Sequence, residues 1–115
     1  MLLPTDLRPG ERRPVVVCQH GAMGQPADTL KPGGAYPETV ALIAPRPFMV
    51  ECGYQDRVAA LEWAAGEYSF VQRLYFQLGI PARTEMAFFD GPHMIHGERT
   101  FAFLHRHLQW PEPGK

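Results

Sequence analysis

The sequence is short of cysteine, of serine and of long apolar runs, and each shortage narrows what the chain can be. Cys18 and Cys52 are the only cysteines, and both lie in segments typical of strands, so we expect two buried free thiols rather than a disulfide. Buried thiols favour a reducing compartment such as the cytoplasm but do not decide it. No apolar stretch approaches the roughly 20 residues of a membrane-spanning helix, and the first residues lack the basic and then apolar layout of a secretion signal. We therefore expect a soluble chain with no membrane partner.

An excess of one charge is also missing. Eleven basic and 12 acidic residues leave a formal net charge of -1 at pH 7. Such a balance provides no general attraction to a polyanion, which argues against nucleic acid as a partner. With 115 residues, 45% of them hydrophobic and 20% charged, the chain has the composition of one ordinary globular domain spanning 1–115.

The order of the apolar segments indicates the fold class. Residues 15–19, 48–52 and 84–89 are typical of buried strands, and 37–44, with Pro37 in its first turn, suits a short helix. Strands that alternate with helices predict an α/β fold with a small, mainly parallel, three-stranded sheet and flanking helices.

Two longer helices are expected. Between residues 59 and 78 apolar side chains recur at steps of three and four, and Gly79 is positioned to end that helix. A last helix over 98–108 would place Phe101, Leu104 and Leu108 on one stripe. These helices cannot cover both apolar faces of three strands, so we expect a homo-oligomer that buries the remainder.

The loops that follow two of the expected strands each carry an ionisable side chain. Asp56 follows the strand at 48–52, and His93 follows the strand at 84–89. In an α/β sheet the carboxyl ends of the strands form the functional edge. The sequence therefore offers an acid and a base there, although neither has an obvious nucleophile beside it.

Two blocks of the sequence resemble α/β-hydrolases, especially the branch of acetyl xylan esterases and dienelactone hydrolases. Pro-Val-Val-Val-Cys-Gln-His-Gly at 14–21 is similar to the strand and turn that precede the oxyanion loop of that family. Ala-Leu-Ile-Ala-Pro-Arg-Pro-Phe-Met-Val-Glu at 41–51 is similar to the segment that enters its penultimate strand. The resemblance implies that Asp56 is the catalytic acid and His93 the catalytic histidine. It also implies an oxyanion region at His20, Gly21 and Ala22.

The chain departs from this family in its middle. Residues 22–35 join the two blocks directly, and no Gly-x-Ser-x-Gly nucleophile elbow is present. The sequence therefore resembles a truncated α/β-hydrolase. Residues 1–35 would form the strand and oxyanion-type loop, and 36–115 would form the part that carries the acid and the histidine.

The nucleophile is left open by the sequence. Ser69, the only serine, lies in the middle of an expected helix, where a packing or surface role is the simpler interpretation. Cys52 ends a strand close to Asp56, where it could be a thiolate nucleophile or an inert buried thiol. A water molecule activated by His93 and Asp56 is a third route.

We expect, from these motifs, a cofactor-free carboxylic ester hydrolase that acts on small or surface-presented esters, polymeric ones included. One alternative is a catalytically inactive, oligomeric scaffold derived from a hydrolase. Another is a metal-binding protein that uses Asp90 and histidines, but a helix points His105 and His107 to different sides, so no metal site is expected. The histidines concerned are His93, His96, His105 and His107.

Overall fold

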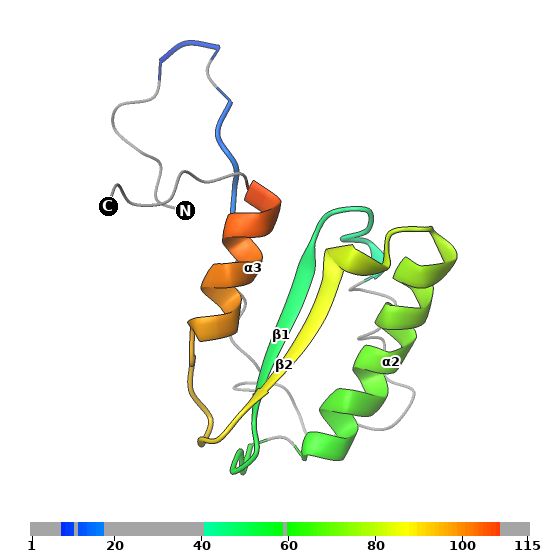
Figure 1. Ribbon diagram of the computed structural model, residues 1–115, viewed down its shortest axis with the longest axis vertical. Helices are drawn as coiled ribbons and strands as arrows, with labels where there is room; N and C mark the ends of the chain where they lie inside the picture. Colours follow the sequence, from blue (N-terminus) through cyan, green and yellow to red (C-terminus); the bar gives the residue numbers. More distant parts are fainter. Residues whose placement is uncertain (1–7, 11, 18–40, 59, 109–115) are drawn as a thin grey trace.

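The computed structural model describes residues 8–10, 12–17, 41–58 and 60–108, which include two strands and two long helices (Figure 1). Along the chain these are β1 (Phe48–Gly53), α2 (Leu61–Gln77), β2 (Thr84–Phe89) and α3 (Glu98–Leu108), with a short 3-10 turn at Pro81–Arg83 before β2. The strands are parallel, and the sheet lies between α2 on one face and α3 on the other. The expected mixed α/β architecture is confirmed.

Helix α2 forms the core with the face of the sheet that it covers. Its spacing of three and four residues buries Tyr68, Val71 and Tyr75, which pack against Phe48 and Met86 from the two strands. The Tyr75 side chain has no exposed surface, and its hydroxyl donates a hydrogen bond of 2.6 Å to the carbonyl of Arg46. This bond joins α2 to the segment that enters β1.

The end of α2 has a simple local cause. The Leu78 amide still donates to the Leu74 carbonyl, but Gly79 follows with a φ of +73°. Side-chain-bearing residues rarely adopt this left-handed conformation, so glycine ends the helix and turns the chain towards β2.

The expected apolar stripe of α3 is wrong at one position. Phe103 is the residue that faces the sheet, with 4% of its surface exposed, whereas Phe101 is 65% exposed. Residues two apart on a helix point in nearly opposite directions, so only one of these rings can face the sheet. The Phe101 ring lies instead next to Gly97, where an added Cβ would touch it. Leu104 and Leu108 are partly buried, as the stripe requires.

The expectation of three strands is not met by the described residues, which contain a two-stranded sheet. Val15, Val16 and Val17 have no regular structure, and Val17 is 86% exposed. Residues 18–19 of the same predicted strand lie outside the described residues. β-branched residues favour strands only where a neighbouring strand offers its backbone, and strand propensity alone does not supply that partner.

The helix expected at 37–44 is described only from Ala41 onward. Ala41 is helical, and the residues after it form turns before β1 begins. The preceding part of this helix lies outside the described residues.

Candidate active site

The parallel pairing of the strands brings two loops together. Gly53 at the end of β1 is level with Phe89 at the end of β2, so the loops that follow start side by side. The backbone amide of Gln55 donates a hydrogen bond of 3.0 Å to the Gly91 carbonyl. The side-chain Nε2 of Gln55 donates one of 2.7 Å to Oδ1 of Asp90. A Cβ on Gly53 would overlap the Gly91 carbonyl. Only glycine therefore permits this close approach of the loops.

The two site residues expected from the sequence are in contact across these loops. Asp56 Oδ2 lies 2.8 Å from His93 Nδ1. Asp56 Oδ1 accepts a hydrogen bond of 2.7 Å from the backbone amide of Val58. Because both oxygens are bonded, the carboxylate has a fixed direction and presents Oδ2 to the imidazole.

Burial differs between the two partners. The Asp56 side chain is 11% exposed, and the His93 side chain is 35% exposed. A carboxylate next to Nδ1 favours the tautomer in which that nitrogen carries the proton, which places the basic lone pair on Nε2. The pair therefore has the chemistry of an oriented general base whose ring reaches the surface.

An open hollow of about 400 Å³ lies beside His93. Among the described residues, its walls are Gln55, Arg57, Val58, Pro92 and His93. None of these residues carries a hydroxyl, a thiol or a carboxylate. A substrate could reach the imidazole here, but the described walls contain no side-chain nucleophile.

Glu51, which the sequence analysis did not select, anchors the loop that carries His93. Its carboxylate accepts hydrogen bonds from the backbone amides of His96 at 3.0 Å and Gly97 at 2.9 Å. Burial alone would raise the pKa of Glu51, but hydrogen bonds from the Thr100 side chain and from these amides outweigh it and lower the pKa. A charged residue within an otherwise apolar strand is the signal that could have identified it.

Cys52 does not have the environment of an activated thiolate. It is 5% exposed, and burial raises the pKa of its thiol, with a further increase from the nearby charge of Asp56. Reactive cysteines instead have lowered pKa values and accessible sulfur atoms. The structure therefore favours the inert, buried thiol over the nucleophile.

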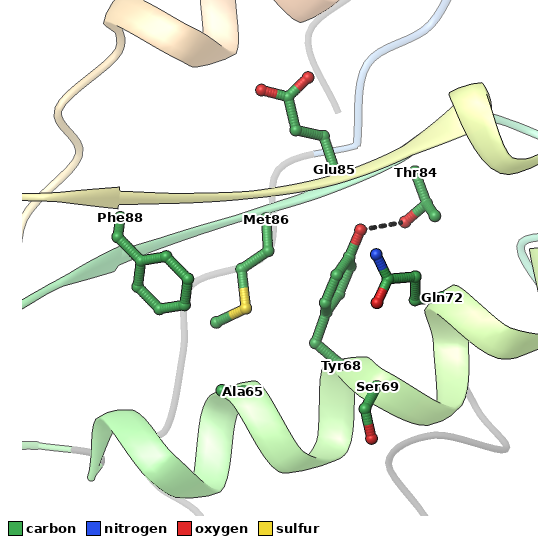
Figure 2. Close-up of a pocket in the computed structure, with 8 residues that line it drawn as sticks. All are labelled: Ala65, Tyr68, Ser69, Gln72, Thr84, Glu85, Met86 and Phe88. Atoms are coloured by element: carbon green, nitrogen blue, oxygen red, sulfur yellow. Dashed lines mark hydrogen bonds between the residues drawn. The ribbon is translucent and has the colours of Figure 1, made fainter.

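Ser69 is on α2, at a different hollow from His93. Its hydroxyl donates to the Gly66 carbonyl at 2.6 Å, and Figure 2 shows it pointing away from β2. The hollow next to it, of about 410 Å³, lies between α2 and β2, where the Tyr68 and Thr84 hydroxyls are hydrogen-bonded at 3.1 Å. His93 is not among its lining residues. The structure thus does not bring Ser69 and His93 together.

The remaining expectations for the site are only partly covered by the structure. His20, Gly21 and Ala22, the expected oxyanion region, lie outside the described residues. In the part that is described, no three His, Cys, Asp or Glu side chains form a group that could hold a metal ion. His96 is stacked on Phe89 with ring centroids 4.8 Å apart, and His107 packs against Phe103 at 4.4 Å. These contacts with aromatic rings give the metal-binding alternative no support.

Comparisons with protein-family models, curated proteins and solved structures find no match to this chain. The similarity to α/β-hydrolases therefore depends on the sequence blocks alone. Of the helices in the described residues, none has the length and apolarity needed to cross a membrane.

Proposed function

We propose that this protein is a carboxylic ester hydrolase of the α/β-hydrolase type, in which His93 is the general base and Asp56 orients it. The observation that supports this most is the 2.8 Å contact between Asp56 Oδ2 and His93 Nδ1 at the carboxyl ends of two parallel strands. The carboxylate fixes the imidazole tautomer and stabilises the imidazolium that forms during proton transfer. Such a pairing is typical of ester hydrolysis by a histidine base.

Water is the nucleophile that best fits the described part of the site. His93 Nε2 would take a proton from a water molecule in the hollow as its oxygen attacks the ester carbonyl. The tetrahedral intermediate would then break the bond to the alcohol oxygen, and the imidazolium would return the proton to this leaving group. The products are a carboxylic acid and an alcohol. This route lacks a covalent intermediate, so we expect it to be slower than that of a serine esterase.

The shape of the hollow favours particular esters. It is open and small, and its described walls contain a short apolar surface from Val58 and Pro92. Small esters, or ester groups presented on the surface of a polymer, could reach His93 without a deep acyl pocket. Large, specific substrates would have few contacts in such a site.

Hydrolysis of p-nitrophenyl acetate by the purified protein tests this proposal. His93→Ala should lower the rate at least 100-fold if the imidazole is the general base, and Asp56→Asn should also lower it. Matched controls are His105→Ala on α3 and Asp90→Asn, which keeps an acceptor for Gln55. Equal rates for the wild type and His93→Ala would overturn the proposal.

Two further variants separate the water route from a covalent one. Cys52→Ala and Ser69→Ala should leave the rate within about twofold, because neither side chain lines the hollow beside His93. A large loss in either variant, with the fold retained by circular dichroism, would identify a covalent nucleophile. Trapping of an acyl-enzyme by mass spectrometry would then confirm it.

A scaffold without catalytic activity is the second candidate. It is favoured by the lack of a hydroxyl or thiol among the described residues that line the hollow. For this candidate, the wild type and all variants would hydrolyse esters at the same background rate.

A further inference from the structure

Arg57 is the permanently charged residue among the described walls of the hollow beside His93. The other described walls are Gln55, Val58 and Pro92, which are uncharged, and His93 itself. Within the described part of the chain, Arg57 forms no ion pair with a carboxylate. The guanidinium of Arg57 is thus available to an anion that enters the hollow.

The acidic residues of the two loops, Asp56 and Asp90, are not among the described walls of the hollow. The Asp56 carboxylate is largely buried, and its two oxygens are bonded to His93 and to the Val58 amide. The Asp90 carboxylate accepts a hydrogen bond from the side-chain amide of Gln55, and Asp90 does not line the hollow. The described surface of the hollow therefore combines a cation with the proposed base and has no exposed carboxylate.

We infer that Arg57 binds an oxyanion group of the substrate, and that the preferred substrates are esters that carry a carboxylate or a phosphate. The inference rests on the proposed ester hydrolysis and names the substrate class for the same site. An arginine presents two parallel N–H donors that match the two oxygens of such a group. Because Arg57 and His93 line one hollow, an ester anchored on Arg57 would hold its carbonyl near the imidazole.

A pair of esters that differ in one charge tests this inference. 4-Acetoxybenzoate carries a carboxylate, and 4-acetoxybenzamide has a neutral group of similar shape at the same position. We expect Arg57→Gln to lower kcat/KM about tenfold for the benzoate, equivalent to about 1.4 kcal/mol, and to leave the benzamide unchanged. Arg73→Gln, which removes the same charge from α2, is the matched control and should change neither rate. 4-Acetoxyphenyl phosphate shows whether phosphate serves as well as carboxylate.

Binding without reaction separates this inference from the proposed function. The probes are 4-hydroxybenzoate and 4-hydroxybenzamide, titrated at constant pH while the His93 Hε1 resonance is followed by NMR. We expect the benzoate alone to shift this resonance, and Arg57→Gln to abolish the shift. If neither ester is hydrolysed but this Arg57-dependent shift is present, the anion site stands and the hydrolase proposal fails. If both esters are hydrolysed equally and Arg57→Gln changes neither rate nor shift, hydrolysis stands and the anion site is overturned.

Discussion

The two carboxylate oxygens of Asp56 have different hydrogen-bond partners, and this orients the contact with His93. Oδ1 binds the Val58 amide within its own loop, and Oδ2 faces the imidazole of the other loop. Aspartate suits this position because its short side chain can bond the backbone two residues ahead in a turn. The turn therefore helps to orient the acid through a contact within its own loop.

Cys52 provides a prediction at the scale of one residue. Its 5% exposure and the raised pKa of its thiol predict that iodoacetamide modifies it much more slowly in the native protein than in urea at pH 8. Digestion and mass spectrometry of the Cys52 peptide would measure this separately from Cys18. A modification rate in the native protein close to that in urea would mean that the Cys52 thiolate is accessible. Cys52 would then again be a candidate nucleophile.

Single residues show what could be predicted from the sequence. Asp56 and His93 were found because each follows an apolar strand, and parallel pairing then brings such strand ends together. Glu51 was missed because its importance depends on where the amides of residues 96 and 97 lie, which strand periodicity does not reveal. Arg57 was missed for a similar reason, since only the folded loop shows which side chains share a hollow.

The loop between β2 and α3 is tied at its start to the loop that follows β1, and at its end to β1 itself. Gln55 holds its start through Asp90 and Gly91, and Glu51 holds its end through backbone amides. Along the chain, His93 lies between these anchor points. Its position relative to Asp56 therefore depends on contacts on either side of it along the chain.

Loss of the Glu51 anchor should loosen this loop. Glu51→Gln retains one carbonyl acceptor but removes the charge, so we expect a loss of about 1–2 kcal/mol in the free energy of unfolding. Hydrogen exchange should become faster at the amides of His96 and Gly97. Glu62→Gln, an exposed change in the first turn of α2, is the control and should leave both amides unaffected. Unchanged protection in Glu51→Gln would contradict the anchoring role.

Helix α3 is attached to β2 through one carboxylate. Glu85 pairs with Arg99 at 2.6 Å and with Arg106 at 2.7 Å, and these two arginines are about two turns apart on the helix. Burial alone would raise the pKa of Glu85, but the hydrogen bonds and charges of these two arginines outweigh it and lower the pKa below 4.5. Both arginines are more than half exposed, so solvent weakens the pairs.

The lowered pKa of Glu85 sets the sign of a pH dependence. The unfolded chain takes up the proton at a higher pH than the folded one, so the pairing stabilises the fold above about pH 4.5 and is lost as the pH falls through the folded pKa. We expect Glu85→Gln to lower the free energy of unfolding by about 1 kcal/mol at pH 7 and by less near pH 3. Urea denaturation at the two pH values measures this. An equal loss of unfolding free energy at both pH values would show that the substitution removes packing contacts rather than a charge interaction.

Elements with a strong local pattern could be predicted well. The span of α3 matches the prediction, and the Tyr68, Val71 and Tyr75 positions of α2 are buried as their spacing requires. The expectation that Phe101 faces the sheet was wrong. Phe101 and Phe103 are both large and apolar, and the sequence alone does not show which of them packs against the sheet. The strand at 15–19 depended on a partner strand that local sequence cannot specify.

At the scale of the whole molecule, apolar side chains that remain on the surface need explanation. Two helices cover the two faces of a two-stranded sheet, yet several large apolar residues of the described chain are more than 60% exposed. They are Val15, Val17, Leu42, Tyr54, Phe76, Ile95 and Phe101. Single exposed apolar residues are common, but this number in a small domain favours association that buries part of this surface.

Self-association is therefore the prediction for the whole chain. We expect light scattering coupled to size-exclusion chromatography to give a mass above the 12.9 kDa of one chain. Association depends on concentration, so the mass should fall on dilution if the assembly is weak. Because the contact would be apolar, added salt should not dissociate it. Phe76→Glu, which places a charge on the outer side of α2, should lower the mass if that surface is buried, whereas Glu62→Gln on the same helix should not. A monomeric mass across the full concentration range would overturn the prediction, and the hydrophobic surface would then belong to single, stable molecules.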